Sequence, residues 1–375
     1  MKIAEIQVFP VIYPTAGRFK FLEDPTGKRT GRAAVLIKIT ADDGTAGWGE
    51  SVPIPKWTYE TIESVTHTIR HYFTPAIRGM DPFDLHSIHE VMNQLIRPGF
   101  TTGMPIAKAG VDIALHDLCG KALGAPLSRL WGRRSGGELT LSWTLNPATM
   151  NDLDRMIDEG LARGFQNFNV KVAPDLKVDI ELCSRVKARI PDGFLWADAN
   201  CGYDLASALK AAPKLADSGV DVLEAPLPPH QISGYKRLRQ QGALPILMDE
   251  GIISPVDLME LIRLDALDGV AMKPARCGGL TSARRQIELL QDAGLMFLGS
   301  GLTDPDVSLS ASLALYHAYG LNKPAALNGP QFLSHSVLKT PFQIANGVIS
   351  LPQGPGLGIV VDEEKIREIS VELKI

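Results

Sequence analysis

Five short apolar segments of this sequence each end in a residue that could take part in catalysis. They follow one another at intervals of about 25 residues, the length of one strand, one helix and two loops. In a closed parallel barrel the carboxyl ends of the strands meet at one mouth, so we expect the five side chains to converge there. They are three carboxylates between two lysines, in the order Lys171, Asp198, Glu224, Asp249 and Lys273.

Carboxylates at neighbouring strand ends indicate a site for a divalent cation. Mg²⁺ binds a few carboxylate oxygens and keeps other positions for water and a ligand. Asp198, Glu224 and Asp249 are therefore the expected metal ligands, with Mn²⁺ as an alternative ion. Each acid could instead cap the helix that follows it, as Asp often does. Three acids at adjacent strand ends, with a lysine on either side of the set, favour the metal site.

A divalent cation and two lysines together suit the removal of a proton beside a carboxylate. The enediolate that this step forms carries two negative charges on its oxygens, which the cation stabilises. The base must be an unprotonated amine, and burial, a second lysine and the cation each lower the pKa of a lysine. Lys171 is the preferred base and Lys273 the acid or base on the opposite face. The simpler alternative is that each lysine only pairs with the acids beside it.

The motifs around these residues resemble the enolase superfamily. Gly47–Glu50 and Gly354–Gly358 extend the resemblance over almost the whole chain. Because a lysine ends the sixth strand, the chain resembles the muconate-lactonizing branch of this superfamily rather than the mandelate-racemase branch. The matching motifs are, in order, Asn169-Val170-Lys171, Asp198-Ala199-Asn200, Glu224-Ala225-Pro226, Asp249-Glu250-Gly251 and Lys273-Pro274.

The resemblance implies a homo-oligomeric enzyme with a Lys or His base and one or two Mg²⁺ ions. One position departs from it. The family commonly has a lysine where this chain has Asn169, so a cation beside Lys171 and the substrate carboxylate is lost. Asn200 and Glu250 are expected next to the metal ligands and lysines, where they would orient or neutralise them. Either could equally be an ordinary hydrogen-bonding group at a strand end.

The pattern of elements predicts an α/β protein of two domains. Residues 1–12 and 33–50 are typical of strands, and helical periodicity follows over 60–96 and 107–123. We therefore predict an N-terminal α+β capping domain over residues 1–128 and a (β/α)₈-type barrel over 129–350. The resemblance implies that residues 351–375 return to the capping domain. The eight expected barrel strands are Leu139–Leu145, Phe168–Val172, Phe194–Ala197, Val220–Leu223, Pro245–Asp249, Gly269–Lys273, Leu295–Ser300 and Ala325–Asn328.

Substrate specificity is expected in two loops of the capping domain, which close over the barrel mouth in the family. The first covers residues 14–32 and the second residues 51–59. Their cations and aromatic rings, with polar residues at other strand ends, are the candidates for substrate contact. The candidates are Arg18, Phe19, Lys20, Phe21, Trp57, Tyr59, Thr144, Ser300, Thr303, Asp304 and Asn328.

Composition limits the classes of partner. The chain has 375 residues, of which 45% are hydrophobic and 21% charged, as in an ordinary globular protein. A net charge of −4 gives no electrostatic footprint for nucleic acid, and no apolar run is long enough to span a bilayer. The first residues alternate like a strand rather than a signal peptide, and the four cysteines lack metal or disulfide spacing. These features predict a cytoplasmic protein with a small-molecule partner.

The predicted function is Mg²⁺-dependent removal of the α-proton of a carboxylate substrate. Two opposed lysines favour racemisation or epimerisation, or the related cycloisomerisation. Loss of a β-hydroxyl, which would make the enzyme a dehydratase, is the second reading. A Schiff-base aldolase could also use Lys171 but would not need three acids. The alternative outside the enzymes is a non-catalytic acid-binding protein built on the same scaffold.

Overall fold

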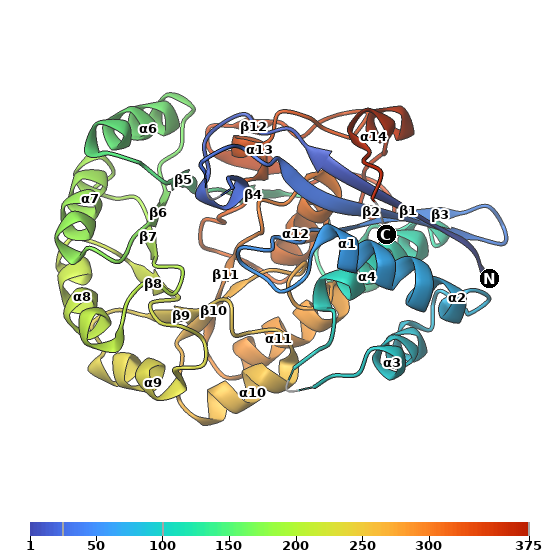
Figure 1. Cartoon of the computed structure of the whole chain (residues 1–375), viewed down its shortest axis with the longest axis horizontal. Helices are drawn as coiled ribbons and strands as arrows, with labels where there is room; N and C mark the ends of the chain where they lie inside the picture. The colour runs from blue at the N-terminus through green and yellow to red at the C-terminus, as the bar shows by residue number, and fades with distance from the viewer. Residues whose placement is uncertain (25, 100, 374–375) are drawn as a thin grey trace.

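The computed structural model describes residues 1–24, 26–99 and 101–373. The N-terminal part is an antiparallel three-stranded sheet, as predicted for 1–12 and 33–50, and it lies on the right in Figure 1. Gly44, with a φ of +87°, makes the turn between its last two strands. The strands are β1 (Ile3–Tyr13), β2 (Arg32–Ala41) and β3 (Ala46–Ser51).

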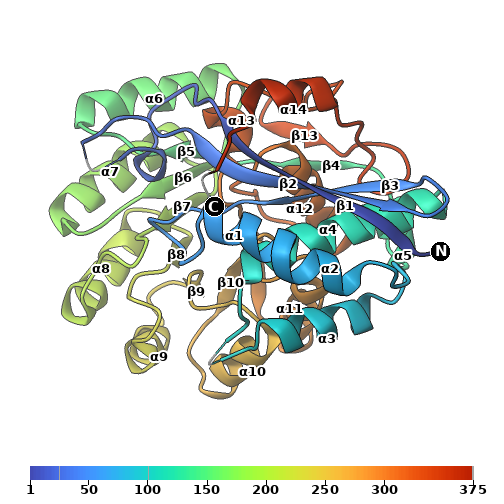
Figure 2. The ribbon, with the colours of Figure 1, turned by 45° about the vertical axis from the view of Figure 1, so that its right-hand side comes forward.

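Helices cover one face of this sheet (Figures 1 and 2). The helix expected over 60–96 is interrupted at residues 78–84, a segment that contains Pro82 and that no helix of the structure includes. The last helix packs directly on β3, where a side chain at Gly49 would meet the carbonyl oxygen of Gly110 at 1.9 Å. The helices are α1 (Ile62–Thr68), the π-helical turn η2 (Ile69–Phe73), α2 (Thr74–Ile77), α3 (Leu85–Leu95) and α4 (Pro105–Ala122).

Glu60 caps the N-terminus of α4 from a fully buried position. Its two carboxylate oxygens accept hydrogen bonds from the backbone N–H groups of Ile106, at 2.7 Å, and Ala107, at 3.0 Å. Burial nevertheless raises the pKa of Glu60 from 4.5 to about 7. Between these values the folded protein binds the proton more tightly than the unfolded chain does. Glu60 therefore makes the free energy of unfolding fall as pH rises through this window.

We expect this fall in the free energy of unfolding with rising pH to be absent in Glu60→Gln, because glutamine does not titrate. Between pH 4.5 and pH 8, the stability of the variant relative to the wild type should rise by up to ~3 kcal/mol. Urea unfolding at several pH values measures the difference. Glu63→Gln, at an exposed position on α1, is the control and should show a constant offset. Parallel pH curves for E60Q and the wild type would contradict the assignment.

The second part is a curled parallel sheet of seven strands in the order β11-β10-β9-β8-β7-β6-β5. Each strand has only three or four residues and is almost fully buried, which explains the continuous apolar runs in the sequence. The strands are β5 (Trp143–Leu145), β6 (Phe168–Lys171), β7 (Leu195–Asp198), β8 (Val222–Glu224), β9 (Ile246–Met248), β10 (Gly269–Met272) and β11 (Met296–Gly299).

Helices alternate with these strands and surround the sheet, with α6 to α9 forming the outer wall on the left of Figure 1. None of the helices in the described ranges combines the length and the apolarity that a membrane crossing needs. The helices are α5 (Leu127–Leu130), α6 (Met150–Ala162), α7 (Leu176–Arg189), α8 (Leu205–Asp217), α9 (Ile232–Gln241), α10 (Pro255–Arg263), α11 (Leu280–Asp292) and α12 (Asp306–Ala318).

The barrel closes differently from the prediction at two of the eight strands. The segment expected over Leu139–Leu145 is split into β4 (Glu138–Thr140), which joins another sheet, and β5. The segment expected over Ala325–Asn328 forms single bridges, from Ala325 to Leu141 and from Ala326 to Ser300. Backbone hydrogen bonds of 2.8 to 2.9 Å at these bridges join the two edges of the sheet. A (β/α)₈-type barrel is therefore confirmed, with bridges in place of its eighth strand.

The C-terminal part crosses back to the N-terminal sheet. The short strand β13 (Val348–Ser350) pairs with β4 on one side and with β12 (Ile344–Ala345) on the other. Helix α14 (Glu363–Ile369) packs on β1, and Ser370 forms a bridge with Val11. The expected return of residues 351–375 is seen in these contacts, except for 374–375, which lie outside the described residues. The boundaries at 128 and 350 stay predictions.

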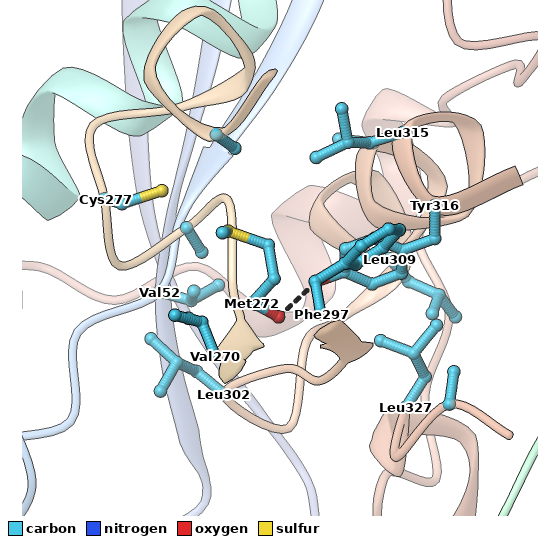
Figure 3. Close-up of a cluster of buried hydrophobic side chains, with 14 of the residues drawn as sticks. Val52, Val270, Met272, Cys277, Phe297, Leu302, Leu309, Leu315, Tyr316 and Leu327 are labelled. Carbon is cyan, nitrogen blue, oxygen red and sulfur yellow. Dashed lines mark hydrogen bonds between the residues drawn. The ribbon is translucent and has the colours of Figure 1, made fainter. Parts of the chain in front are cut away.

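One buried cluster connects the last barrel strands to the capping loops. Figure 3 shows Val270 and Met272 of β10, Phe297 of β11 and Tyr316 of α12 packed together. The hydroxyl of Tyr316 donates to the carbonyl oxygens of Met272 and Ser300, the latter at 2.7 Å. The phenol thereby fixes the ends of both strands, just before Lys273 and the loop after β11.

Candidate active site

The register of the parallel strands places the predicted catalytic residues side by side. Lys171 pairs with Asp198, and Asp198 pairs with Glu224, so these three residues lie level at the carboxyl ends of β6, β7 and β8. Asp249 directly follows β9, and Lys273 directly follows β10. All five side chains therefore lie at one end of the barrel, as the spacing in the sequence predicted.

The two lysines and the acids form buried ion pairs. Lys171 donates to Asp198 Oδ2 and Lys273 to Asp249 Oδ2. The Nζ atom of Lys273 also lies 3.6 Å from Glu224 Oε1. Oε1 of Glu224 is buried and has no hydrogen-bond partner among the described residues. Glu224 is therefore the least satisfied of the three acids.

The charges within this cluster oppose one another. Burial and the neighbouring Asp198 raise the pKa of Glu224 well above its ordinary value. Burial would also raise the pKa of Asp198, but the ammonium groups of Lys171 and Lys273 lower it. Burial acts to lower the pKa of Lys171, yet the charges of Asp198 and Glu224 prevail and raise it. Lys171 is thus held protonated here, whereas the sequence led us to expect a lowered pKa in the presence of a cation.

Arg276 is a member of this cluster that the sequence did not reveal. It follows β10 in the loop after Lys273, is 1% exposed, and donates to Asp249 Oδ1. Its Nε and Nη2 atoms have no hydrogen-bond partner within the described ranges. Asp249 therefore lies between two cations. No spacing in the sequence distinguishes Arg276 from a surface arginine, since only the fold turns it inward.

The acids do not form a ready cage for a metal. Within residues 1–24, 26–99 and 101–373, no group of three or more His, Cys, Asp and Glu side chains is arranged to hold an ion. The donor set nevertheless fits a hard divalent cation, because three buried carboxylates lie at adjacent strand ends and one has an unpartnered oxygen. Such an ion would compete with Lys171 and Lys273 for the same oxygens.

A cavity opens above this cluster, between the barrel mouth and the capping loops. Twelve predicted residues line it, including both lysines and two of the acids. The other lining residues were not among the predicted site residues; they come from the loop of residues 51–59, the loop after β11 and the bridge segment, where the sequence carries no periodic pattern. The predicted ones are Phe19, Phe21, Trp57, Asn169, Lys171, Asp198, Asn200, Glu224, Lys273, Ser300, Thr303 and Asn328; the added ones are Ile54, Gly301, Leu302 and Ala326.

The loops bring aromatic rings over the lysines. Trp57 lies with its ring 4.7 Å from Nζ of Lys273, a cation–π contact. Phe19 stacks on Phe332 of α13 (Gly329–Phe332), with ring centroids 4.6 Å apart. These rings exclude water from one side of the cavity, which strengthens the electrostatic interactions inside it. The loops thus act as the wall that the sequence predicted.

Five predicted substrate contacts, the predicted metal ligand Asp249 and the neighbouring Glu250 lie outside the cavity lining. Tyr59 is 63% exposed. Arg18 has a side chain that is 56% exposed and pairs with Glu23 at 3.1 Å. Thr144 hydrogen-bonds through its backbone to Gln331, and Asp304 accepts from the backbone N–H of Leu302. The carboxyl of Glu250 is buried, which raises its pKa to about 7.

Lys20 occupies an intermediate position. It belongs to the 3₁₀ turn η1 (Lys20–Leu22) between the cavity-lining Phe19 and Phe21. Its Nζ lies 5.1 Å from the centroid of the Phe21 ring. Partial burial and the positive charge of Lys171 lower the pKa of Lys20. Its ammonium group is therefore close enough to sense the catalytic cluster without lining the cavity.

Three asparagines support or line the site. Asn200, with a φ of +43°, donates from its backbone N–H and its side chain to Asp198, at 2.8 and 3.0 Å. It therefore orients that carboxylate, as expected. Asn169 shares the inward face of β6 with Lys171, and its buried Nδ2 has no partner in the described part of the chain. Asn328 donates to Thr144 Oγ1 at 3.3 Å and leaves its own oxygen unpaired there.

Two sequence families match most of the chain. Residues 25–132 match the N-terminal domain of the mandelate racemase / muconate lactonizing enzyme family. Residues 152–365 match the enolase C-terminal domain-like family. The second match contains all the predicted metal ligands and both lysines.

Known proteins of similar sequence and structure are isomerases. The N-succinyl-L-Arg/Lys racemase of Bacillus cereus is 28% identical over 99% of this chain and 98% of its own. The chloromuconate cycloisomerase of Delftia acidovorans is 30% identical over 98% of both chains. The crystal structure of the muconate lactonizing enzyme from Klebsiella pneumoniae superposes with a TM-score of 0.89 at 28% identity, covering 99% of this chain and all of the other.

The order of the strand-end residues, the barrel with its capping sheet and these matches agree over the whole length of the chain. The protein belongs to the mandelate racemase and muconate lactonizing enzyme family of the enolase superfamily, in which the proteins similar to it are isomerases.

Proposed function

We propose that this protein forms the enediolate of a small carboxylic acid at the cavity between Lys171 and Lys273. It does so either by removing the α-proton, after which a proton returns to the same carbon, or by closing a ring between a carboxylate oxygen and a conjugated C=C bond, after which a lysine protonates the α-carbon. The product is a racemised, epimerised or cycloisomerised acid. One observation carries the proposal: two lysines, one partly buried on β6 and one buried after β10, enter one cavity with acids between them. Three strands separate β6 from β10 in the sheet, so the amines approach from different sides.

The position of each residue in the site indicates its role. Beside a bound cation, whose charge favours the neutral amine, Lys171 accepts the α-proton, and the ammonium group of Lys273 delivers one from the other face. Asp198, Glu224 and Asp249 would hold a divalent ion, Mg²⁺ by preference, since hard carboxylate oxygens suit it. The ion supplies positive charge beside the substrate carboxylate, where negative charge develops. Trp57, Phe19 and Phe21 exclude water from the site.

Solvent-deuterium exchange at the α-carbon tests the proposal. A panel of amino, N-acylamino, hydroxy and unsaturated acids is incubated with the protein and Mg²⁺ in D₂O. Exchange with inversion or ring closure supports the isomerase. Formation of a keto acid would overturn it in favour of a dehydratase, and absence of exchange for every acid would overturn it in favour of an acid-binding protein.

Asn169 is expected to contact the substrate directly. Its Nδ2 is buried, faces the cavity and has no partner in the described part of the chain, so a substrate oxygen can accept its hydrogen bond. Asn169→Ala should raise KM about tenfold for the acid that exchanges, the cost of one hydrogen bond. The midpoint of thermal unfolding without ligand should change little, because Nδ2 has no hydrogen bond to lose within the described part of the chain. An unchanged KM would show that Asn169 contributes no substrate contact.

A further inference from the structure

Arg32 connects the two segments that form the outer wall of the cavity. It lies at the start of β2, is 1% exposed, and therefore carries a buried charge. Every hydrogen bond that its guanidinium donates within the described residues goes to a backbone carbonyl oxygen. A buried cation costs stability unless its donors are satisfied, so such a site needs a structural reason.

The carbonyl groups belong to segments far apart in the sequence. On one side Nη1 donates to Pro53 at 2.7 Å and Nη2 to Val52 at 2.8 Å. On the other side Nε donates to Leu302 at 2.9 Å and to Thr303 at 3.3 Å. Val52 and Leu302 also lie in the same buried hydrophobic cluster (Figure 3). One rigid guanidinium thus joins a capping loop to the loop after β11.

Both segments contribute to the cavity. The loop that follows Val52 carries Ile54 and Trp57, and the other contains Leu302 and Thr303, all of which line it. Trp57 in turn contacts Lys273. Thr303 has a φ of +55°, a backbone conformation that a non-glycine residue adopts only when its surroundings hold it. The hydrogen bond to its carbonyl oxygen is one such restraint.

We propose that Arg32 is a positioning residue that fixes the capping loop of residues 52–57 against the barrel loop of residues 300–303 and thereby sets the wall of the substrate cavity over Lys273. The expected change in kinetics rests on the proposed function, whereas the expected change in loop structure does not. Lysine at this position keeps the charge but lacks the planar fork that reaches both loops at once.

Two variants and a control test the assignment. Arg32→Met removes the fork, and Arg32→Lys retains the charge. Arg70→Met is the matched control, because Arg70 also donates to a backbone carbonyl, that of Val8 at 2.8 Å, and touches neither cavity loop. Hydrogen–deuterium exchange reports on the loops through the amides of Trp57 and Leu302, which are hydrogen-bonded in the folded chain.

In R32M we expect the protection of the amides in both loops against exchange to fall tenfold or more, while that of the strands in the N-terminal sheet stays unchanged. The protection in R32K should lie between that of R32M and that of the wild type. The protection in R70M should equal that of the wild type. For the acid that exchanges its α-proton, KM should rise and kcat/KM fall about 100-fold in R32M, because a misplaced wall misorients the substrate. An unchanged KM, or protection lost evenly over the whole sheet, would reduce Arg32 to a general folding role and overturn the proposal. If the wild type exchanges no acid, the proposed function fails while the protection data still decide the role of Arg32. Should R32M not fold, R32K gives both readouts.

Discussion

Replacing Lys171 with methionine is expected to lower α-proton exchange about 10³-fold or more for one enantiomer of the substrate. A positioned base contributes roughly 10² to 10⁴ in rate, and methionine keeps the length of the side chain without a basic atom. Lys273→Met should produce the same loss for the other enantiomer. Each variant should keep exchange of the proton that faces its remaining lysine. Measuring deuterium incorporation separately for the two enantiomers shows this reciprocal pattern.

The control for these variants is Lys177→Met, an exposed lysine on α7, which should exchange both enantiomers at the wild-type rate. Methionine at 171 also leaves Asp198 without its ion-pair partner, so thermal unfolding with Mg²⁺ present must show that K171M is folded at the assay temperature. Equal loss for both enantiomers in K171M and K273M would contradict the assignment of one lysine to each face. Schiff-base chemistry at Lys171 would be recognised by trapping with borohydride, which should form no adduct.

The sequence predicted the residues at strand ends better than those in loops, for a physical reason. Lys171, Asp198 and Glu224 follow apolar runs whose burial sets the phase of each strand, so their direction is determined locally. Arg276 and Leu302 lie in loops, where the direction of a side chain depends on contacts with distant segments. Such contacts, like those of Arg32 to two loops, leave no pattern along the chain.

The eighth strand and the predicted substrate contacts show the same limit. Ala325 and Ala326 bridge two sheet edges, a role decided by barrel closure rather than by the propensity of four residues. Arg18 lies in a loop whose composition is typical of a binding loop, but its side chain pairs with Glu23 and is exposed to solvent. Asp304 was expected at a strand end but lies in the loop after β11, where its carboxylate accepts a hydrogen bond from the backbone N–H of Leu302. Residue type alone could not separate these cases from Trp57, which does line the cavity.

The metal assignment depends most on Glu224, and its replacement has two effects of opposite sign. Glu224 is 1% exposed, lies level with Asp198 and has an unpartnered carboxylate oxygen in the described part of the chain. Without a bound ion, Glu224→Gln removes a buried negative charge that is only partly compensated. We therefore expect the variant to be more stable than the wild type in the presence of a chelator, by about 1–3 kcal/mol.

With Mg²⁺ the order should reverse. An ion that binds only the folded wild type at 100 times its dissociation constant stabilises it by about 2.7 kcal/mol, whereas E224Q lacks one anionic ligand and should gain little. Urea unfolding with chelator and with saturating Mg²⁺ measures both effects, and Glu368→Gln, at an exposed position, should behave as the wild type in both. Full Mg²⁺ stabilisation of E224Q would remove Glu224 from the ligand set. A less stable variant in chelator would instead show that Lys273, 3.6 Å away, already compensates this charge, so that no electrostatic strain remains for an ion to relieve.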